Sequence, residues 1–94
     1  GVTARVIVAP PEDALIREVT VSGTTWLRDI KENEQVLSKV RYQMRPSPCN
    51  IRTDNDNTQL VFETPQKPTA PGQVAAFYVE DELVGGGIVS TIIQ

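Results

Sequence analysis

The chain has 94 residues, enough for one small domain with a limited interior, and no apolar run approaches the roughly 20 residues that span a bilayer. Nine basic and twelve acidic residues leave a net charge of −3, which argues against a free-standing nucleic-acid-binding protein. With no histidine and one cysteine, the sequence offers neither an internal disulfide nor the ligands of a structural zinc site.

The first quarter of the sequence predicts short β elements. Residues 6–9 are β-prone and are followed by two prolines, which stop the strand. Residues 12–16 predict a single helical turn, too short to be stable alone. Residues 18–22 alternate polar and apolar side chains, as a half-buried strand does, and Gly23 is predicted to end it.

A surface loop is predicted between this strand and the next. Trp26 and Leu27 follow the glycine turn, and we expect both to close the core. Residues 29–35 are mostly polar and predict the loop itself. Residues 37–44 alternate again and predict a strand.

Alternation divides the side chains of residues 37–44 between two faces. Lys39 and Arg41 share one face. Val40, Tyr42 and Met44 lie on the other, where they are expected to be buried behind the two basic residues.

A β-hairpin is predicted in the middle of the chain. Residues 49–53 and 58–63 have strand character, and the second strand places Leu60 and Phe62 on one face. Between them, residues 54–57 read Asp-Asn-Asp-Asn. Asp and Asn accept local hydrogen bonds and tolerate left-handed φ, so this tetrapeptide predicts the turn.

The next segment begins with an extended connection over residues 65–71, which contain three prolines. Pro71 presets φ for the first central position of a turn, and Gly72 suits the positive φ that follows in a type II turn. Residues 73–79 are apolar and aromatic and predict a strand.

Three consecutive glycines, Gly85, Gly86 and Gly87, lie at the start of the last predicted strand, residues 86–93. Glycine weakens an ordinary strand, so the run predicts a sharp bend or a close backbone approach at a barrel corner. About six short strands separated by Gly/Pro turns predict an all-β fold, a small antiparallel β-barrel.

No catalytic residue is predicted. Cys49 is the only candidate nucleophile, but no histidine is present to act as its base, and we expect a buried structural thiol. Glu80, Asp81 and Glu82 are adjacent in a reversal and predict a solvated turn, because metal-binding loops space their ligands and add carbonyl groups. We therefore expect no metal and no cofactor in this chain.

Aromatic side chains could stack on RNA bases. The chain has only five of them to fill a core, so burial is expected for Phe77 and Trp26. Tyr42 or Tyr78 is expected to expose a ring edge.

Four pieces of the sequence together resemble the end domain of the MnmA-type tRNA-specific 2-thiouridylases. The first is Thr-Ala-Pro-Gly-Gln (69–73) with the later Ala-Phe-Tyr (76–78) and Gly-Gly-Gly-Ile-Val (85–89). The second is Lys-Val-Arg-Tyr-Gln (39–43) with the later Pro-Cys (48–49). The third is Val-Phe-Glu-Thr-Pro (61–65), and the fourth is Trp-Leu (26–27). Their order and spacing over residues 15–92 make the resemblance specific. The chain departs from the family pattern at Leu83, where Cys is frequent, and at Glu80-Asp81, where Asp-Gly is frequent.

The resemblance implies a protein larger than this chain. Residues 1–94 are then a single β-barrel domain, similar to the second domain of translation factors, at the C-terminal end of a tRNA 2-thiouridylase. Residues 1–14 belong either to the barrel or to the end of a preceding connecting domain. The parent enzyme would be cytoplasmic and would use ATP in a catalytic domain to replace the 2-oxygen of a wobble uridine with sulfur from a donor protein. The family's Ser-Gly-Gly-x-Asp-Ser nucleotide motif is absent here, so this fragment is expected to be non-catalytic.

The partners that the resemblance implies for the barrel are tRNA and the catalytic and connecting domains. Between Glu34 and Asp54 the sequence has four basic residues and no acid. A basic face would meet phosphates, so Lys39, Arg41 and Arg45 are the predicted RNA-binding residues. Ordinary scatter of surface charge explains the same window equally well.

Two other functions remain open on the sequence alone. The first is a purely structural barrel that packs on neighbouring domains and touches RNA little. The second is a translation-factor-type barrel module, because Pro-Gly-Gln before a strand also occurs in the second domains of elongation factors.

Overall fold

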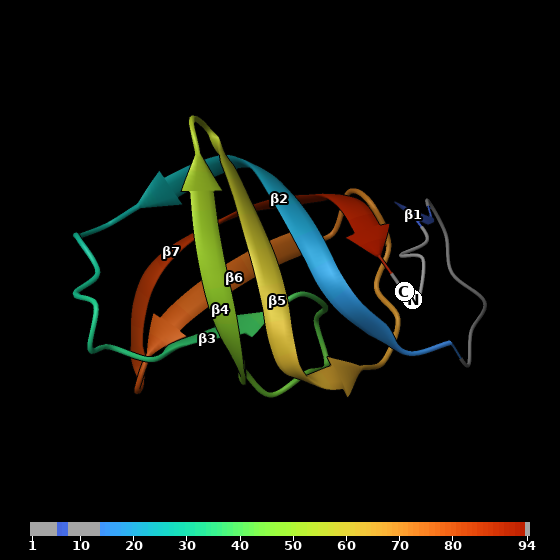
Figure 1. Cartoon of the computed structure of the whole chain (residues 1–94), viewed down its shortest axis with the longest axis horizontal. Helices are drawn as coiled ribbons and strands as arrows, with labels where there is room; N and C mark the ends of the chain where they lie inside the picture. Colours follow the sequence, from blue (N-terminus) through green and yellow to red (C-terminus); the bar gives the residue numbers. More distant parts are fainter. Residues whose placement is uncertain (1–5, 8–13, 94) are drawn as a thin grey trace, which may run out of the picture.

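Residues 6–7 and 14–93 are described by a computed structural model, and they form strands and loops (Figure 1). The seven strands are β1 (Val6–Ile7), β2 (Ile16–Trp26), β3 (Val36–Lys39), β4 (Ser47–Asp54), β5 (Asn57–Gln66), β6 (Val74–Val79) and β7 (Glu82–Ile93). Within those residues, no helix with the length and apolar character of a membrane span is found.

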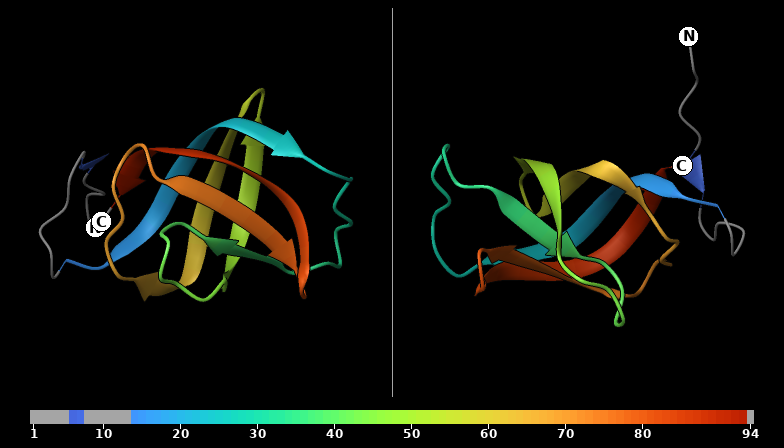
Figure 2. Two further views of the ribbon diagram at one scale, coloured as in Figure 1. Left: turned by 180° about the vertical axis from the view of Figure 1, so that it is seen from behind. Right: turned by 90° about the horizontal axis from the view of Figure 1, so that it is seen from below.

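Six strands close into an antiparallel barrel. The order β7-β2-β5-β4-β3-β6 returns to its start, because β6 pairs with β7 as well as with β3. Strand β1 lies outside this ring and adds to β7, where Val6 pairs with Ile93. Figure 2 shows the ring from behind and from below. The predicted all-β barrel of about six strands is therefore confirmed.

Aliphatic side chains and two phenylalanines fill the barrel. Trp26 packs against this core and stacks on Phe77, with ring centroids 4.9 Å apart. Leu27, by contrast, is 63% exposed, so the prediction that it closes the core is wrong. It lies just past the end of β2, where its backbone N–H donates to the carbonyl of Val84 at the barrel rim. The buried apolar residues are Ile16, Val19, Val21, Val36, Val40, Cys49, Leu60, Phe62, Ala75, Phe77, Val84, Val89 and Ile92.

Strand β2 is longer than its sequence pattern predicts. Gly23 does not end the strand but lies inside it with φ +60°, where the register against β7 shifts between Ser22 and Thr25. A glycine at positive φ allows such a bulge, after which the ladder continues to Trp26. The helical turn predicted for residues 12–16 falls partly outside the described residues, and its last residue begins β2.

Strand β3 is shorter than predicted, because it ends at Lys39. A turn follows at Tyr42 and Gln43, so alternation no longer decides which side chains are buried there. Val40 is buried and Met44 packs against the core, as predicted. Tyr42 is 84% exposed, so the burial that alternation predicted for it is wrong, whereas the expectation that Tyr42 or Tyr78 exposes its ring is confirmed.

The predicted central hairpin is confirmed. Strands β4 and β5 pair from Cys49↔Phe62 to Asp54↔Asn57, and both extend beyond their predicted ends. Asn55 takes φ +55° in the two-residue turn, as expected of a residue type that tolerates left-handed backbone.

Strand β7 runs without a break from Glu82 to Ile93, so the glycines lie within one strand and not before a separate one. A Cβ added at Gly86 would lie 2.6 Å from the carbonyl oxygen of Ala75, and one at Gly87 would lie 2.7 Å from that of Ser22. Glycine therefore lets β7 lie close to β6 on one side and to β2 on the other.

Candidate nucleic-acid interface

The outer face of the β3–β6 ladder forms a groove of about 260 Å³. The register pairs Lys39 with Ala76 and Leu37 with Tyr78, so these side chains leave the barrel on the same side. Figure 2 shows the two strands side by side in its left view. The lining residues are Lys39, Arg41, Tyr42, Gln73, Val74, Ala76 and Tyr78.

Lys39 and Arg41, both predicted as RNA-binding residues, line this one groove. Among residues 6–7 and 14–93, no carboxylate lines it. Among the described residues, the ion pairs within 4.0 Å join Arg28 to Glu34 and to Glu82, so neither groove cation is neutralised by a carboxylate of that part of the chain. Lysine and arginine are the residue types that bind anions such as phosphate.

The turn after β3 places the side chains of Arg41 and Tyr42 beside Lys39 at the edge of the groove. Lys39 places its Nζ 5.6 Å from the centroid of the Tyr42 ring, within the range of a cation–π contact. Arg41 donates from Nη1 to the carbonyl of Gln43 at 3.1 Å. Its Nε is buried and has no hydrogen-bond partner among the residues described.

Arg45, the third predicted residue, is exposed but does not line the groove. It lies in the connection before β4, and its carbonyl accepts a hydrogen bond from Ser47 Oγ at 3.3 Å. The structure thus brings two of the three predicted residues together.

Sequence reasoning missed Gln73 and Val74, which form the opposite wall of the groove. Val74 is 67% exposed, an unusual position for a valine in a predicted core strand. Only the pairing of β6 with β3 places these residues beside Lys39, and no local pattern encodes that pairing.

The turn that holds Gln73 contains two of the residues predicted to be structural. Gln73 N–H donates to the carbonyl of Ala70 at 3.2 Å, and Gly72 between them has φ +94°. With Pro71 at the first central position, this is the geometry of a type II turn. Gly72 N–H also donates to the carbonyl of Val89 at 2.8 Å, which attaches the turn to β7.

A second, apolar groove of about 480 Å³ lies on the other side of β6. Its floor includes Gly85, Gly86 and Gly87. It shares Val74 and Ala76 with the groove lined by Lys39 and Arg41, which is called the basic groove from here on. Exposed apolar side chains border it: Leu27, Val74, Leu83 and Ile88. Side chains of this kind in one groove are typical of an interaction surface.

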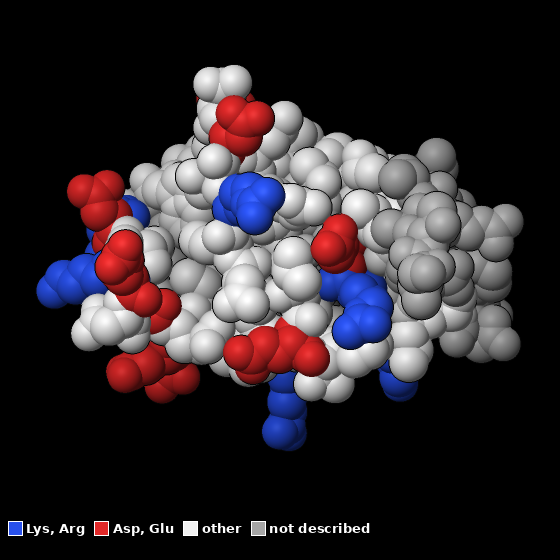
Figure 3. All heavy atoms as spheres, in the orientation of Figure 1, with Lys and Arg blue, Asp and Glu red and all other residues white. Residues whose placement is uncertain are grey.

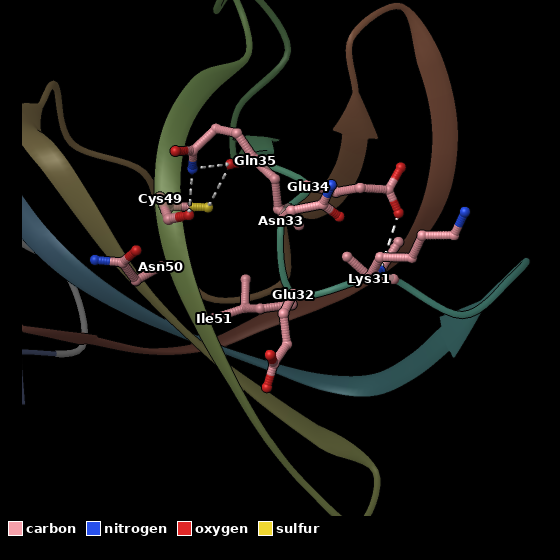
Figure 4. Close-up of a pocket in the computed structure, with 10 residues that line it drawn as sticks. Lys31, Glu32, Asn33, Glu34, Gln35, Cys49, Asn50 and Ile51 are labelled. Carbon is pink, nitrogen blue, oxygen red and sulfur yellow. Dashed lines mark hydrogen bonds between the residues drawn. The ribbon is translucent and has the colours of Figure 1, made fainter.

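A third depression, of about 420 Å³, lies between the loop after β2 and strand β4 (Figure 4). Gln35 donates from Nε2 to the carbonyls of Val36 and Cys49, both at 3.0 Å. Cys49 donates from Sγ to the carbonyl of Val36 at 3.7 Å, and burial raises the pKa of its thiol to about 12. The sulfur is therefore protonated at neutral pH and poorly suited to act as a nucleophile.

Charge is separated along the β3–β6 ladder. Acidic side chains gather at the end formed by the loop between β2 and β3 and by the β6–β7 hairpin, with basic ones among them (Figure 3). That end adjoins the pair Val36↔Val79, whereas the basic groove begins at Lys39. The acids of this end are Asp29, Glu32, Glu34, Glu80, Asp81 and Glu82.

Comparisons with known proteins also indicate a β-barrel domain. A family model described as "Aminomethyltransferase beta-barrel domain" matches residues 16–89. Proteins named tRNA-specific 2-thiouridylase MnmA are similar to the chain: that of Chlorobium phaeobacteroides is 37% identical over 81% of this chain, that of Syntrophotalea carbinolica 32% over 92%, and that of Geobacter metallireducens 35% over 88%. The matched part spans 22%, 25% and 23% of those relatives' lengths, respectively.

Proposed function

Because the chain belongs to the aminomethyltransferase β-barrel domain family, we propose that it is the non-catalytic end domain of a tRNA wobble-uridine 2-thiolation enzyme. In that enzyme it contacts tRNA and positions it for a catalytic domain elsewhere in the polypeptide. The names of the matched relatives support the substrate, tRNA, and the modification, 2-thiouridine. The proposal includes ATP as cofactor of the catalytic domain, a sulfur-donor protein as partner, and the cytoplasm as location.

The basic groove is the observation that supports tRNA contact. Lys39 and Arg41 lie in one groove, and no carboxylate from the described part of the chain lines it. Lysine and arginine there suit phosphate oxygens, which set affinity and register but carry no sequence information. The barrel thus supplies position, while recognition of the uridine belongs to other parts of the enzyme.

The experiment removes both charges, Lys39→Ala with Arg41→Ala, from the full-length enzyme. We expect a higher Kd for tRNA and a salt dependence reduced by about two phosphate contacts, each of which contributes roughly 0.7–0.9 to the slope of log K against log salt. Turnover at saturating tRNA changes less. The matched control is Arg17→Ala with Lys67→Ala, which removes the same charge from two exposed residues outside the groove. Affinity and salt slope equal to the parent's in the groove variant would overturn the proposal.

A second candidate function, packing between domains, is favoured by the apolar groove. Leu27 and Leu83 are 63% and 49% exposed at its border. The matched relatives are about four times the length of the matched part or longer, so in them the barrel adjoins other chain that could cover this surface.

We expect Leu27→Ser with Leu83→Ser to leave the 94-residue chain nearly as stable as before, because both side chains are exposed. In the full-length enzyme the same variant lowers the temperature at which the domains separate, measured by limited proteolysis on heating. Unchanged proteolysis would contradict packing at this groove without bearing on tRNA contact at the other.

A further inference from the structure

The basic groove has a second half that phosphate contacts alone do not explain. Beside Lys39 and Arg41, its lining consists of two tyrosines, two aliphatic side chains and one glutamine. A phosphate needs only the cations. Flat rings and methyl groups next to them fit the apolar faces of a nucleobase.

Tyr42 is the most exposed large hydrophobic side chain among those described, at 84%. It lies in a turn directly after Val40, which is buried and whose carbonyl accepts a hydrogen bond from Thr69 Oγ1. The backbone before the turn is thus fixed, while the ring itself projects into solvent. An aromatic ring in this position provides a stacking surface at small cost in conformational entropy.

The remaining lining residues provide the other contacts that a nucleotide makes. Val74 and Ala76 are aliphatic and lie on the wall formed by β6, and Tyr78 adds a second ring. Gln73 is exposed and has both an amide donor and a carbonyl acceptor, which suit the polar edge of a base. The volume of about 260 Å³ lies just below the roughly 300–1,000 Å³ of drug-sized pockets, a size that suits one small group such as a single nucleotide.

We propose that this groove binds a single unpaired nucleotide of an RNA, with the base against Tyr42 and the adjoining phosphate at Lys39 and Arg41. The inference rests on the proposed function, because it names the part of the RNA that the basic groove receives. Bases of paired segments are stacked inside the helix, so the barrel would select an unstacked nucleotide in a loop or bulge.

The test measures binding of a fluorescently labelled single-stranded RNA pentamer to the 94-residue chain by anisotropy. A pentamer of equal length with abasic central positions and a short RNA duplex are the comparison probes. We expect Tyr42→Ala to weaken binding of the intact pentamer roughly 5- to 100-fold and to leave binding of the abasic pentamer unchanged. Tyr42→Phe, which keeps the ring, restores parental affinity. Because Tyr42 is exposed, its replacement leaves the core intact.

The outcomes separate this inference from the proposed function. If Tyr42→Ala binds the intact pentamer like the parent while Lys39→Ala with Arg41→Ala weakens it, the groove contacts phosphate only and the nucleotide site is overturned. If the charge variant also binds the pentamer like the parent, the nucleotide site is overturned, whereas tRNA contact is decided by the same variant in the full-length enzyme. Failure of the parent to bind the pentamer, or preference for the duplex, overturns the nucleotide site as well.

Discussion

Arg28 and Glu34 form a two-pronged ion pair within the loop that joins β2 to β3: the Nη1–Oε1 and Nη2–Oε2 distances are both 2.9 Å. The same guanidinium donates from Nε to Glu82 Oε2 at 3.2 Å, at the start of β7. The backbone N–H of Lys31 adds a further hydrogen bond to Glu34 at 2.9 Å. One arginine therefore connects the loop to the β6–β7 hairpin.

Because of this ion pair, the free energy of unfolding should depend on pH in the acidic range. Hydrogen bonds from Arg28, followed by that from the Lys31 N–H, lower the pKa of Glu34 from 4.5 to about 2. Its contribution to stability is complete above the unfolded-state pKa of 4.5 and is lost as the pH falls toward 2. We expect the unfolding free energy to decrease over this interval more in the parent than in Glu34→Gln. Urea unfolding at about pH 6 and about pH 3 measures the difference.

Glu32→Gln is the control for this prediction, because Glu32 is exposed on the same loop and forms no ion pair with a described residue. It should follow the acid dependence of the parent. If both variants lost the same part of the pH dependence of the unfolding free energy, that dependence would come from overall charge and not from the Arg28–Glu34 pair.

One substitution in the β6–β7 turn should increase the stability of the barrel. Glu80 has φ +54°, in the left-handed region that costs an L residue roughly 1–2 kcal/mol. Asn tolerates this region better, so we expect Glu80→Asn to raise the unfolding free energy by about 0.5–1 kcal/mol. Asp81→Asn removes an equal charge at the next residue, whose φ is not positive, and should have little effect. Equal stabilisation by both variants would attribute the gain to charge.

Cys49 is expected to be an unreactive, structural thiol. It is 2% exposed, and its pKa is raised to about 12, first by burial and then by Glu63. A thiol reagent at neutral pH should label it only after unfolding. Cys49→Ser should cost about 1–3 kcal/mol of stability by burying a hydroxyl. If the full-length protein is the proposed thiolation enzyme, its sulfur transfer should survive. Loss of turnover at unchanged thermal stability would instead assign the thiol a functional role.

Gly86→Ala should destabilise the barrel by about 1–3 kcal/mol, because the new methyl group would lie 2.6 Å from the backbone oxygen of Ala75, which cannot rotate away. Gly23→Asn is the control. Gly23 has φ +60°, which Asn tolerates, and apart from its chain neighbours no described residue has an atom within 4 Å of the added Cβ. Thermal unfolding of both variants distinguishes crowding from loss of glycine flexibility; equal destabilisation would contradict crowding.

Local patterns predicted the elements that have one face in the core and one in water. The hairpin of β4 and β5 is an example, since Leu60 and Phe62 alternate with exposed residues and Asn55 lies in a recognisable turn. Tyr42 was misplaced because the strand ends at Lys39, and alternation has no meaning in the turn beyond it. Gln73 was missed because its place in the groove depends on pairing between strands far apart in the sequence.

The separation of charge along the β3–β6 ladder gives the barrel an electric dipole. With a net charge of −3, the domain as a whole is repelled by a polyanion, but its acidic and basic ends experience opposite forces. If the barrel contacts RNA as proposed, these forces would produce a torque that turns the Lys39 end toward the phosphates before contact. The acids of the β2–β3 loop would then also affect the approach, by restricting the orientation in which the molecules meet.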